Sequence, residues 1–207
     1  GAARYLAERA GVEIVGVTVS EEQAKVARET NAGLPVEIRV QDYREVAERF
    51  DRVYSIGMFE HVGVKNYRTY METVRANLVD PAGLTLLHTI GGNRSSSRTD
   101  PWMDRYIFPN SAIPSASQIT AAAEGVLTLE DWHNFGPDYD RTLMAWHTNV
   151  SDAWDHLPDT YDERFRRMWD FYRLVSAGGF RARYLQLWQV VFSRDGLAEP
   201  YGPPHIR

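Results

Sequence analysis

The chain has 207 residues, with 23 lysines and arginines, 28 aspartates and glutamates, a formal charge of -5 and no cysteine. Hydrophobic residues make up 43% and aromatic residues 12%, which is enough for a substantial core and excludes wholesale disorder. The lack of cysteine excludes disulfide and thiolate chemistry within this stretch, and the acidic balance disfavours a general nucleic-acid binder.

The first part of the chain alternates helical and strand-like segments. The expected elements, in chain order, are a helix over 1–10 ended by Gly11, a strand over 12–17, a helix starting at Ser20, a strand over 36–40, a short helix over 44–49, a strand over 51–56, a helix over 66–78 and a strand over 84–90. This spacing predicts βαβ units and an α/β fold with a mainly parallel sheet.

From Gly92 the pattern changes. The expected elements are a polar loop over 93–98, an irregular aromatic stretch over 100–114, a helix over 117–124, an apolar stretch over 126–132, helices over about 139–154 and 161–177, the second ended by Gly178-Gly179, and a strand over 184–192. A tail follows over 196–207.

Polar side chains follow the first predicted strands, at the edge where α/β sheets bind ligands. Thr18, with Gln23 one helical turn later, is suited to bond a ribose diol. Ordinary N-capping of the helix by Ser20 is the alternative, and this segment alone favours it.

Gln41, Asp42 and Tyr43 close the next strand. The carboxylate of Asp42 could accept a hydrogen bond from an exocyclic adenine amine, and the Tyr43 ring could flank the base. A strand-ending turn uses Asp for its own hydrogen bonds just as readily, so both interpretations stay open.

The run from Gly57 to Gly63 places Glu60 and His61 directly after a predicted buried strand. The glycines let the backbone turn closely around a ligand. A carboxylate next to Met58 and Phe59 would have its pKa raised by desolvation, or would pair with a buried donor. The alternative is an incidental Glu-His pair in a surface loop.

His88 ends the following strand, beside Glu60 at the same edge, although a lone histidine there is usually a satisfied core residue. Tyr139, which begins a predicted helix, could offer its phenol to the same pocket. No histidine forms the short-spaced pair of a zinc protease, so no metal site is predicted. The sequence also has no nucleophile elbow, phosphate-binding loop or dinucleotide fingerprint.

Arginines interleaved with aromatic residues are concentrated near the end of the chain. They are Arg164, Arg166, Arg167, Arg173, Arg181 and Arg183. A solvated helix face is the default interpretation, and a docking surface for anionic lipid headgroups is the alternative.

Taken in order, these motifs closely resemble the cyclopropane-fatty-acyl-phospholipid synthases. The segments that carry the resemblance are Val15–Ser20 with Gln23, Gln41–Arg44, Gly57–Gly63, Leu87–Gly91, Tyr106–Asn110, Glu130–Gly136, Thr142–Trp146 and Gln186–Phe192. The resemblance implies a Rossmann-like methyltransferase fold with helices on both faces of the sheet. It also implies one catalytic domain over 1–195, with a helical and aromatic lipid-site insertion around 92–180.

The family uses S-adenosylmethionine to add a methylene across a cis double bond of a phospholipid acyl chain. The resemblance implies that Thr18, Ser20, Gln23, Gln41, Asp42, Tyr43 and Gly57 bind this cofactor. It also implies that Glu60, His88, the Ile90 amide and Tyr139 bind a bicarbonate ion, the base that deprotonates the carbocation, with the aromatic segment 102–108 excluding water. Related methyl-branching or methylene-forming enzymes, and a non-catalytic lipid-binding remnant, are the alternatives.

The sequence lacks the first strand, the Gly-rich loop that cradles the methionine part of the cofactor, the preceding helical segment and a cysteine, all present in the family. Gly1 resembles the last residue of that loop. We therefore expect an amino-terminally truncated fragment that binds S-adenosylmethionine poorly by itself. The expected partners are unsaturated phospholipid and the inner face of the membrane, with cytoplasmic localisation and no nucleic acid, and a homodimer stays open.

Overall fold

The computed structural model describes residues 1–199, 201 and 202. The predicted tail over 196–207 lies partly outside the described residues. The chain forms two compact units, Gly1–Glu48 and Arg49–Arg207.

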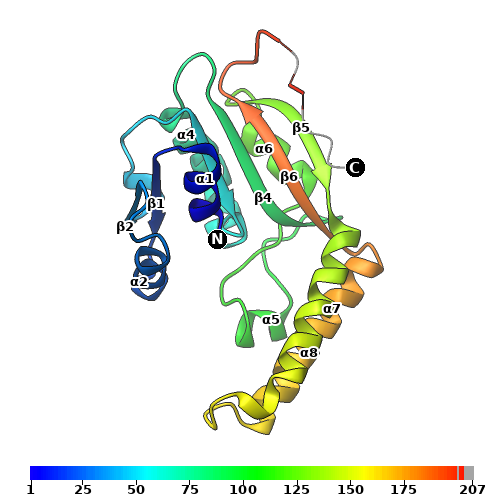
Figure 1. Cartoon of the computed structure of the whole chain (residues 1–207). Coiled ribbons are helices and arrows are strands. Elements are labelled where there is room, and N and C mark those ends of the chain that lie inside the picture. Colours follow the sequence, from blue (N-terminus) through cyan, green and yellow to red (C-terminus); the bar gives the residue numbers. More distant parts are fainter. Residues whose placement is uncertain (200, 203–207) are drawn as a thin grey trace. The chain divides into compact units, whose positions relative to one another are not determined.

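The first unit is built on two parallel strands. It contains α1 (Ala2–Ala10), β1 (Ile14–Thr18), α2 (Glu21–Thr30), β2 (Val36–Val40) and the 3-10 turn η1 (Tyr43–Glu45). The strands pair in parallel from Ile14 with Val36 to Thr18 with Val40, so both carboxyl ends lie at one edge. The α2 helix packs on these strands through the fully buried Ala24 (Figure 1).

Local signals set the helix boundaries in this unit. Gly11 ends α1 in the left-handed conformation, with φ 63°, and Ser20 caps α2 by accepting a 3.2 Å hydrogen bond from the Gln23 amide. Both boundaries confirm the predictions. The predicted helix over 44–49 is wrong: Asp42 accepts a bond from the Arg44 amide, and only the short turn η1 forms.

The second unit surrounds a four-stranded sheet. Its elements are β3 (Arg52–Ile56), α3 (Phe59–Val62), the 3-10 turn η2 (Val64–Asn66), α4 (Tyr67–Asn77), β4 (Leu84–Gly92), α5 (Pro101–Tyr106), α6 (Ala116–Ala123), β5 (Thr128–Asn134), α7 (Gly136–Asp152), the 3-10 turn η3 (Trp154–His156), α8 (Glu163–Arg181) and β6 (Leu185–Ser193).

This sheet is mixed, in contrast to the mainly parallel sheet predicted. The strand order is β3-β4-β6-β5, with β3 parallel to β4 and β6 antiparallel to both its neighbours. The reason is the helix pair between β5 and β6. The α7 helix leads away from the end of β5, and α8 returns to the same edge of the sheet (Figure 1). The next strand, β6, therefore starts beside the end of β5 and runs antiparallel to it.

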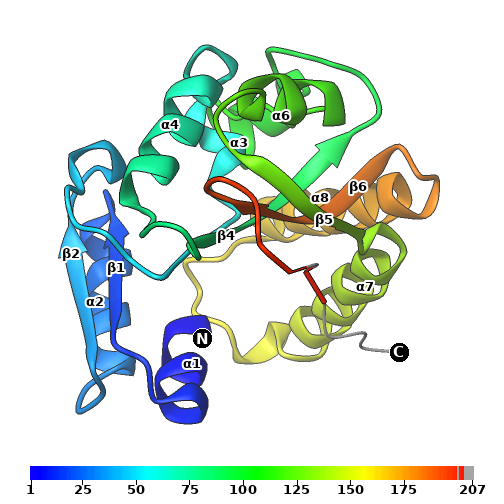
Figure 2. The same cartoon turned by 90° about the horizontal axis from the view of Figure 1, so that it is seen from above.

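The core of the second unit lies on both sides of β4 and β6. Figure 2 shows α4 and α6 next to each other on one side of this sheet. The α4 helix buries Tyr67, Tyr70, Met71 and Val74, which recur at helical spacing and face the core. On β6, seven of nine residues are buried, because both faces of this strand are covered.

The α7–α8 hairpin projects beyond the edge where β4 and β5 end (Figure 1). Leu143, Ala177, Phe180 and Leu187 form its buried cluster, against which Ile90 packs. Arg173 is 2% exposed and donates a 2.8 Å bond to the Trp146 carbonyl, which ties α8 to α7.

Three predicted boundaries in this region are wrong. The α8 helix runs through Gly178-Gly179 to Arg181, because contacts with α7 and β6 outweigh the low helix propensity of glycine. The α7 helix begins at Gly136, and the stretch expected to be irregular contains α5, capped by Asp100. The apolar stretch over 126–132 is largely strand β5. No helix among the described residues is long and apolar enough to cross a bilayer.

Candidate active site

Glu60 is one of the few buried ionisable residues of the second unit. It lies on the short helix α3, directly after β3, and is 7% exposed. Its Oε1 accepts a 2.7 Å hydrogen bond from the Ile90 amide, and its buried Oε2 has no partner among the described residues. Burial raises the pKa of Glu60, and the Ile90 amide, the Glu60 backbone amide and the Thr89 hydroxyl oppose this shift. A carboxyl in this position can keep its proton and donate it.

His88 lies on β4, in register with Ile56 at the end of β3. Its carbonyl accepts a 3.0 Å bond from the Gly57 amide, and Gly57 turns away with φ 62°. The Nδ1 atom of His88 lies 3.2 Å from Nε2 of Gln189 on β6. Burial lowers the pKa of His88, so the ring is neutral near pH 7 and can present one donor and one acceptor.

Tyr139 lies in the first turn of α7 and contributes a phenol. Its ring packs edge-on against Phe180, with centroids 5.0 Å apart. The pKa of Tyr139 is raised mainly by burial and further by the negative charge of Glu60. The hydroxyl of Tyr139 therefore stays protonated and shares its electrostatic environment with the Glu60 carboxyl.

The structure thus brings Glu60, Ile90 and Tyr139 together, as the family resemblance implies, and places His88 two residues before Ile90 on β4. His88 pairs with Gln189, and no contact joins its ring to Glu60 in the described structure. All four residues lie near the edge where β3 and β4 end.

Tyr67, close to Glu60, and Tyr172, close to Tyr139, are two buried tyrosines that the sequence does not predict for this site. Tyr67 is 2% exposed, and burial together with the charge of Glu60 raises its pKa to about 12. Burial, reinforced by Tyr139, also raises the pKa of Tyr172 to about 12. Tyr67 belongs to a helix whose amphipathic pattern indicates core packing. Tyr172 belongs to the arginine-rich helix, for which the sequence indicates a solvated face or a lipid-docking surface, and no local signal in the sequence assigns either tyrosine to the site.

The first unit carries the polar residues expected at a nucleoside. The Thr18 hydroxyl donates a 2.9 Å bond to Oε1 of Gln23, and the Gln41 amide donates a 3.0 Å bond to the Thr18 carbonyl. The Gln23 side chain therefore accepts its bond from Thr18, and not from the Ser20 backbone amide as it would in a capping box. Its side-chain NH2 group stays available as a donor at the strand end.

Asp42 is engaged by its own turn. Its two carboxylate oxygens accept bonds from the Arg44 backbone and guanidinium at 2.6 to 2.9 Å, and these bonds lower the pKa of Asp42 to about 2. Burial is the main cause that raises the pKa of Tyr43. The turn interpretation of Asp42 is confirmed, and its cofactor role stays a prediction. Among the described residues, no cluster of three or more potential metal ligands occurs.

Solved structures with the same architecture define the fold. The cyclopropane synthase MmaA2 from Mycobacterium tuberculosis has a TM-score of 0.84 at 22% identity, over 92% of this chain and 73% of that one. The mycolic acid cyclopropane synthase CmaA1, solved with SAH and CTAB, has a TM-score of 0.83 at 24% identity, with the same coverage. The fold is that of the S-adenosylmethionine-dependent methyltransferases.

The sequence comparison narrows the class to one family. The model of the family described as mycolic acid cyclopropane synthetase matches residues 1–190, and the chain belongs to this family. The cyclopropane-fatty-acyl-phospholipid synthase of Escherichia coli K12 is 53% identical over 94% of this chain and 50% of its own length. The probable fatty acid methyltransferase Rv3720 of M. tuberculosis is 37% identical over 94% of this chain and 47% of its own length. The chain therefore spans about half the length of these curated relatives.

Proposed function

We propose that the full-length protein containing this chain is a cyclopropane-fatty-acyl-phospholipid synthase. It would use S-adenosylmethionine to convert a cis double bond of a phospholipid acyl chain into a cyclopropane ring. The observation that carries the proposal is the buried Glu60 carboxyl, held by the Ile90 amide beside Tyr139, in a chain 53% identical to an enzyme of that name.

The first unit offers groups that fit the nucleoside of S-adenosylmethionine. Thr18 and Gln23 would hold the ribose hydroxyls, with Ser20 and Gln41 fixing the two turns that carry them. Asp42 and Tyr43 would contact the adenine. The cofactor role expected of Gly57, which belongs to the second unit, stays a separate prediction. When bound, S-adenosylmethionine supplies the electrophilic methyl group.

The second unit offers groups that fit a small oxyanion. The unpartnered Oε2 of Glu60 is a buried atom that needs a hydrogen-bond partner, and a protonated carboxyl can donate to an anion. His88 and the phenol of Tyr139 are further donors, and the Ile90 amide orients Glu60. Bicarbonate, when bound there, supplies the base for the proton that the new methyl group must lose before the ring closes.

Aromatic side chains would protect a cationic intermediate. The ring of Tyr139 presents a π system close to Glu60, and ring faces stabilise positive charge. Phe108 and Tyr172, whose centroids are 5.7 Å apart, continue this wall. Excluding water is essential, because water would trap the cation as an alcohol.

We further propose that the substrate is membrane phospholipid and that the protein works peripherally on the cytoplasmic face of the membrane. A lipid-like ligand suits this fold, since the solved CmaA1 complex contains CTAB, an amphiphile with one long alkyl tail.

The test is mass analysis of lipids from cells that express the full-length gene. The proposal predicts acyl chains that gain one methylene while the alkene is lost. A methyl-branched chain, or a product that keeps its alkene, would instead support a methyl-branching activity. Tuberculostearic acid methyltransferase UfaA1, which is 34% identical over 90% of this chain, is a relative named for such an activity. Unchanged lipids would point to a non-catalytic module.

A further inference from the structure

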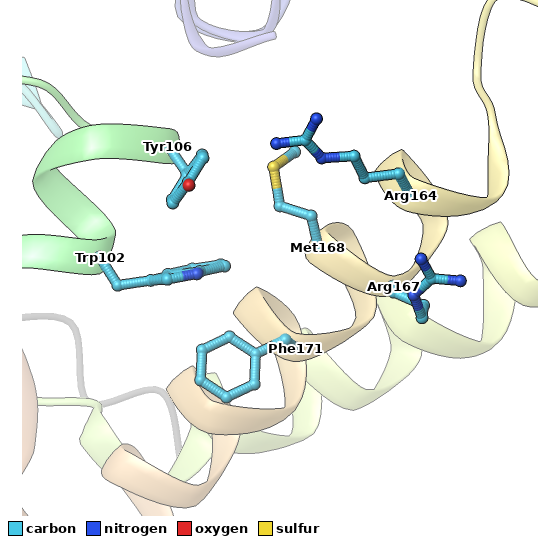
Figure 3. A pocket seen from close by; sticks show the side chains of 6 residues that line it. All are labelled: Trp102, Tyr106, Arg164, Arg167, Met168 and Phe171. Carbon is cyan, nitrogen blue, oxygen red and sulfur yellow. The ribbon is translucent and has the colours of Figure 1, made fainter.

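An open hollow of about 310 Å³ lies between α5 and α8, and Glu60 is not among its lining residues. It is lined by Trp102, Tyr106, Arg164, Arg167, Met168 and Phe171. Figure 3 shows the Arg164 guanidinium reaching over the Met168 thioether toward Tyr106, with Arg167 farther out along α8. We call this feature the α5–α8 hollow. It combines cationic and aromatic groups in one place.

The positive charge in the hollow is available to a ligand. Arg164 makes no ion pair or hydrogen bond with any described residue, and Arg167 has only Glu163, at 3.6 Å in a largely exposed pair. By contrast, Arg173 is buried in hydrogen bonds and Arg181 is held by Asp140 at 2.9 Å. The arginines near the end of the chain thus divide into structural ones and two that line the hollow, of which Arg164 extends its guanidinium over it and Arg167 lies at its outer rim.

The aromatic side chains of the hollow pack against each other and still remain exposed to solvent. Trp102 contacts Phe171 edge-on with centroids 4.6 Å apart, yet Phe171 remains 51% exposed and Tyr106 40%. Leu174 and Val175, 45% and 43% exposed, follow Phe171 at helical spacing on the same face of α8. One helix face therefore carries arginines at its start and apolar side chains after them.

Aromatic contacts connect this face with the candidate active site. Tyr172, next to Phe171 on α8, packs against Phe108 and interacts electrostatically with Tyr139, which in turn feels the charge of Glu60. Arg164 and Tyr172 are separated by about 12 Å along the helix axis, at 1.5 Å per residue. This is of the same order as the distance between the phosphate of a phospholipid and the middle of its acyl chain.

We propose that the α5–α8 hollow binds the phosphodiester group of a phospholipid through Arg164 and Arg167, with the start of the acyl chain over Trp102 and Phe171. The inference rests on the proposed function, which it deepens by assigning the headgroup end of the substrate. Guanidinium groups bond phosphate oxygens in pairs, and the adjacent rings suit methylene groups but not a free phosphate ion.

The experiment uses the full-length protein with the double variant R164A/R167A. With dispersed unsaturated phosphatidylcholine, a zwitterionic lipid, we expect the KM for lipid to rise roughly tenfold or more while kcat stays within about twofold. The affinity for S-adenosylmethionine should not change. The variant R164K/R167K, which keeps the charge, should recover part of the loss.

The matched control is R166A, on the same helix, where Arg166 lies over the Trp154 ring at 5.2 Å and outside the hollow. It should leave the KM unchanged. A loss confined to anionic vesicles, equal in R166A and abolished by salt, would overturn the proposal in favour of diffuse surface attraction. An unchanged KM with an altered oligomeric state or stability would show that protein covers this face, and would also overturn it.

Direct binding of phosphatidylcholine vesicles, measured by co-sedimentation without S-adenosylmethionine, separates this inference from the proposed function. If the protein forms no cyclopropane product yet R164A/R167A loses vesicle binding, the hollow still binds phospholipid. If product forms and the double variant binds vesicles and turns over normally, only the hollow is wrongly assigned. Inorganic phosphate should not compete with the vesicles, because it lacks the acyl chain.

Discussion

The amide of Ile90 donates a 2.7 Å hydrogen bond to Oε1 of Glu60 and so joins the end of β4 to the short helix that follows β3. This bond helps to orient a carboxyl whose second oxygen is buried and forms no geometrically complete hydrogen bond with the described residues. The backbone at the end of β4 thereby fixes the side chain of Glu60, which follows the neighbouring strand β3. Such an arrangement is costly for stability alone, which is the physical reason to assign it a role in binding or catalysis.

The variant Glu60→Gln tests that role in the full-length protein. The amide oxygen of glutamine still accepts the bond from Ile90, but the side chain can no longer gain or lose a proton. We expect turnover on unsaturated phospholipid to fall roughly a hundredfold or more, with unchanged affinity for S-adenosylmethionine by calorimetry. The exposed control Glu72→Gln should keep full activity. Wild-type turnover in Glu60→Gln would remove Glu60 from the mechanism.

The pH dependence of stability should carry opposite contributions from Glu60 and His88. Burial raises the pKa of Glu60 above its ordinary value of 4.5, so the folded chain binds this proton more tightly than the unfolded chain. The free energy of unfolding should therefore decrease as the pH rises from about 4.5 toward the folded pKa. In Glu60→Gln this slope should disappear in urea titrations at a series of pH values.

For His88 the sign is reversed. Burial lowers its pKa below 6.5, so the unfolded chain binds the proton more tightly, and stability should be lost as the pH falls from 6.5 toward the folded pKa. The variant His88→Asn should flatten this part of the curve, whereas His156→Asn, at an exposed position, should not. The same flattening in both variants would show that His88 is not specially buried.

Much of this site could be predicted because its groups follow strand ends. The β-branched run before Thr18 and the strand-like segment 51–56 before Gly57 locate two such ends, and chemistry there is expected from the topology of parallel strands. The pairing of Glu60 with the Ile90 amide could not be predicted. It depends on the register of β3 with β4 and on a short helix with too few residues to show a period.

The mixed sheet and the extended α8 were missed for a related reason. Gly178 and Gly179 favour a helix end locally, yet Phe180 lies in the buried cluster of the hairpin, and its burial keeps the helix intact. Likewise, the direction of β6 follows from two helices packing as a hairpin, a contact between residues far apart in sequence. Local propensity cannot encode either result.

Gly91 provides a test of packing at this strand end. A Cβ atom at Gly91 would lie 2.1 Å from the ring of Trp188, which is itself packed against Trp132 with centroids 5.1 Å apart. Gly91→Ala should therefore lower the free energy of unfolding by roughly 1–3 kcal/mol or more in urea titrations. The control Gly178→Ala has open space around its Cβ and lies in α8, so it should stabilise by up to about 1 kcal/mol. Equal effects would contradict the packing described for Trp188.

Asp42 and Arg44 allow the two interpretations of the β2 end to be separated. Both carboxylate oxygens of Asp42 accept bonds from Arg44, which shapes the turn. The open question is whether Asp42 also binds the adenine amine of S-adenosylmethionine. If Asp42 contacts the cofactor, Asp42→Asn should raise the Kd roughly tenfold, because an amide oxygen is a weaker acceptor than a carboxylate. Arg44→Ala removes the ion pair but leaves the carboxylate free for the amine, so its Kd should stay the same or decrease. Calorimetry on the full-length protein measures both, with Arg52→Ala as a control outside this turn. Both variants remove the ion pair between Asp42 and Arg44. If both weaken the binding of S-adenosylmethionine equally, Asp42 acts only by shaping the turn and does not contact the cofactor.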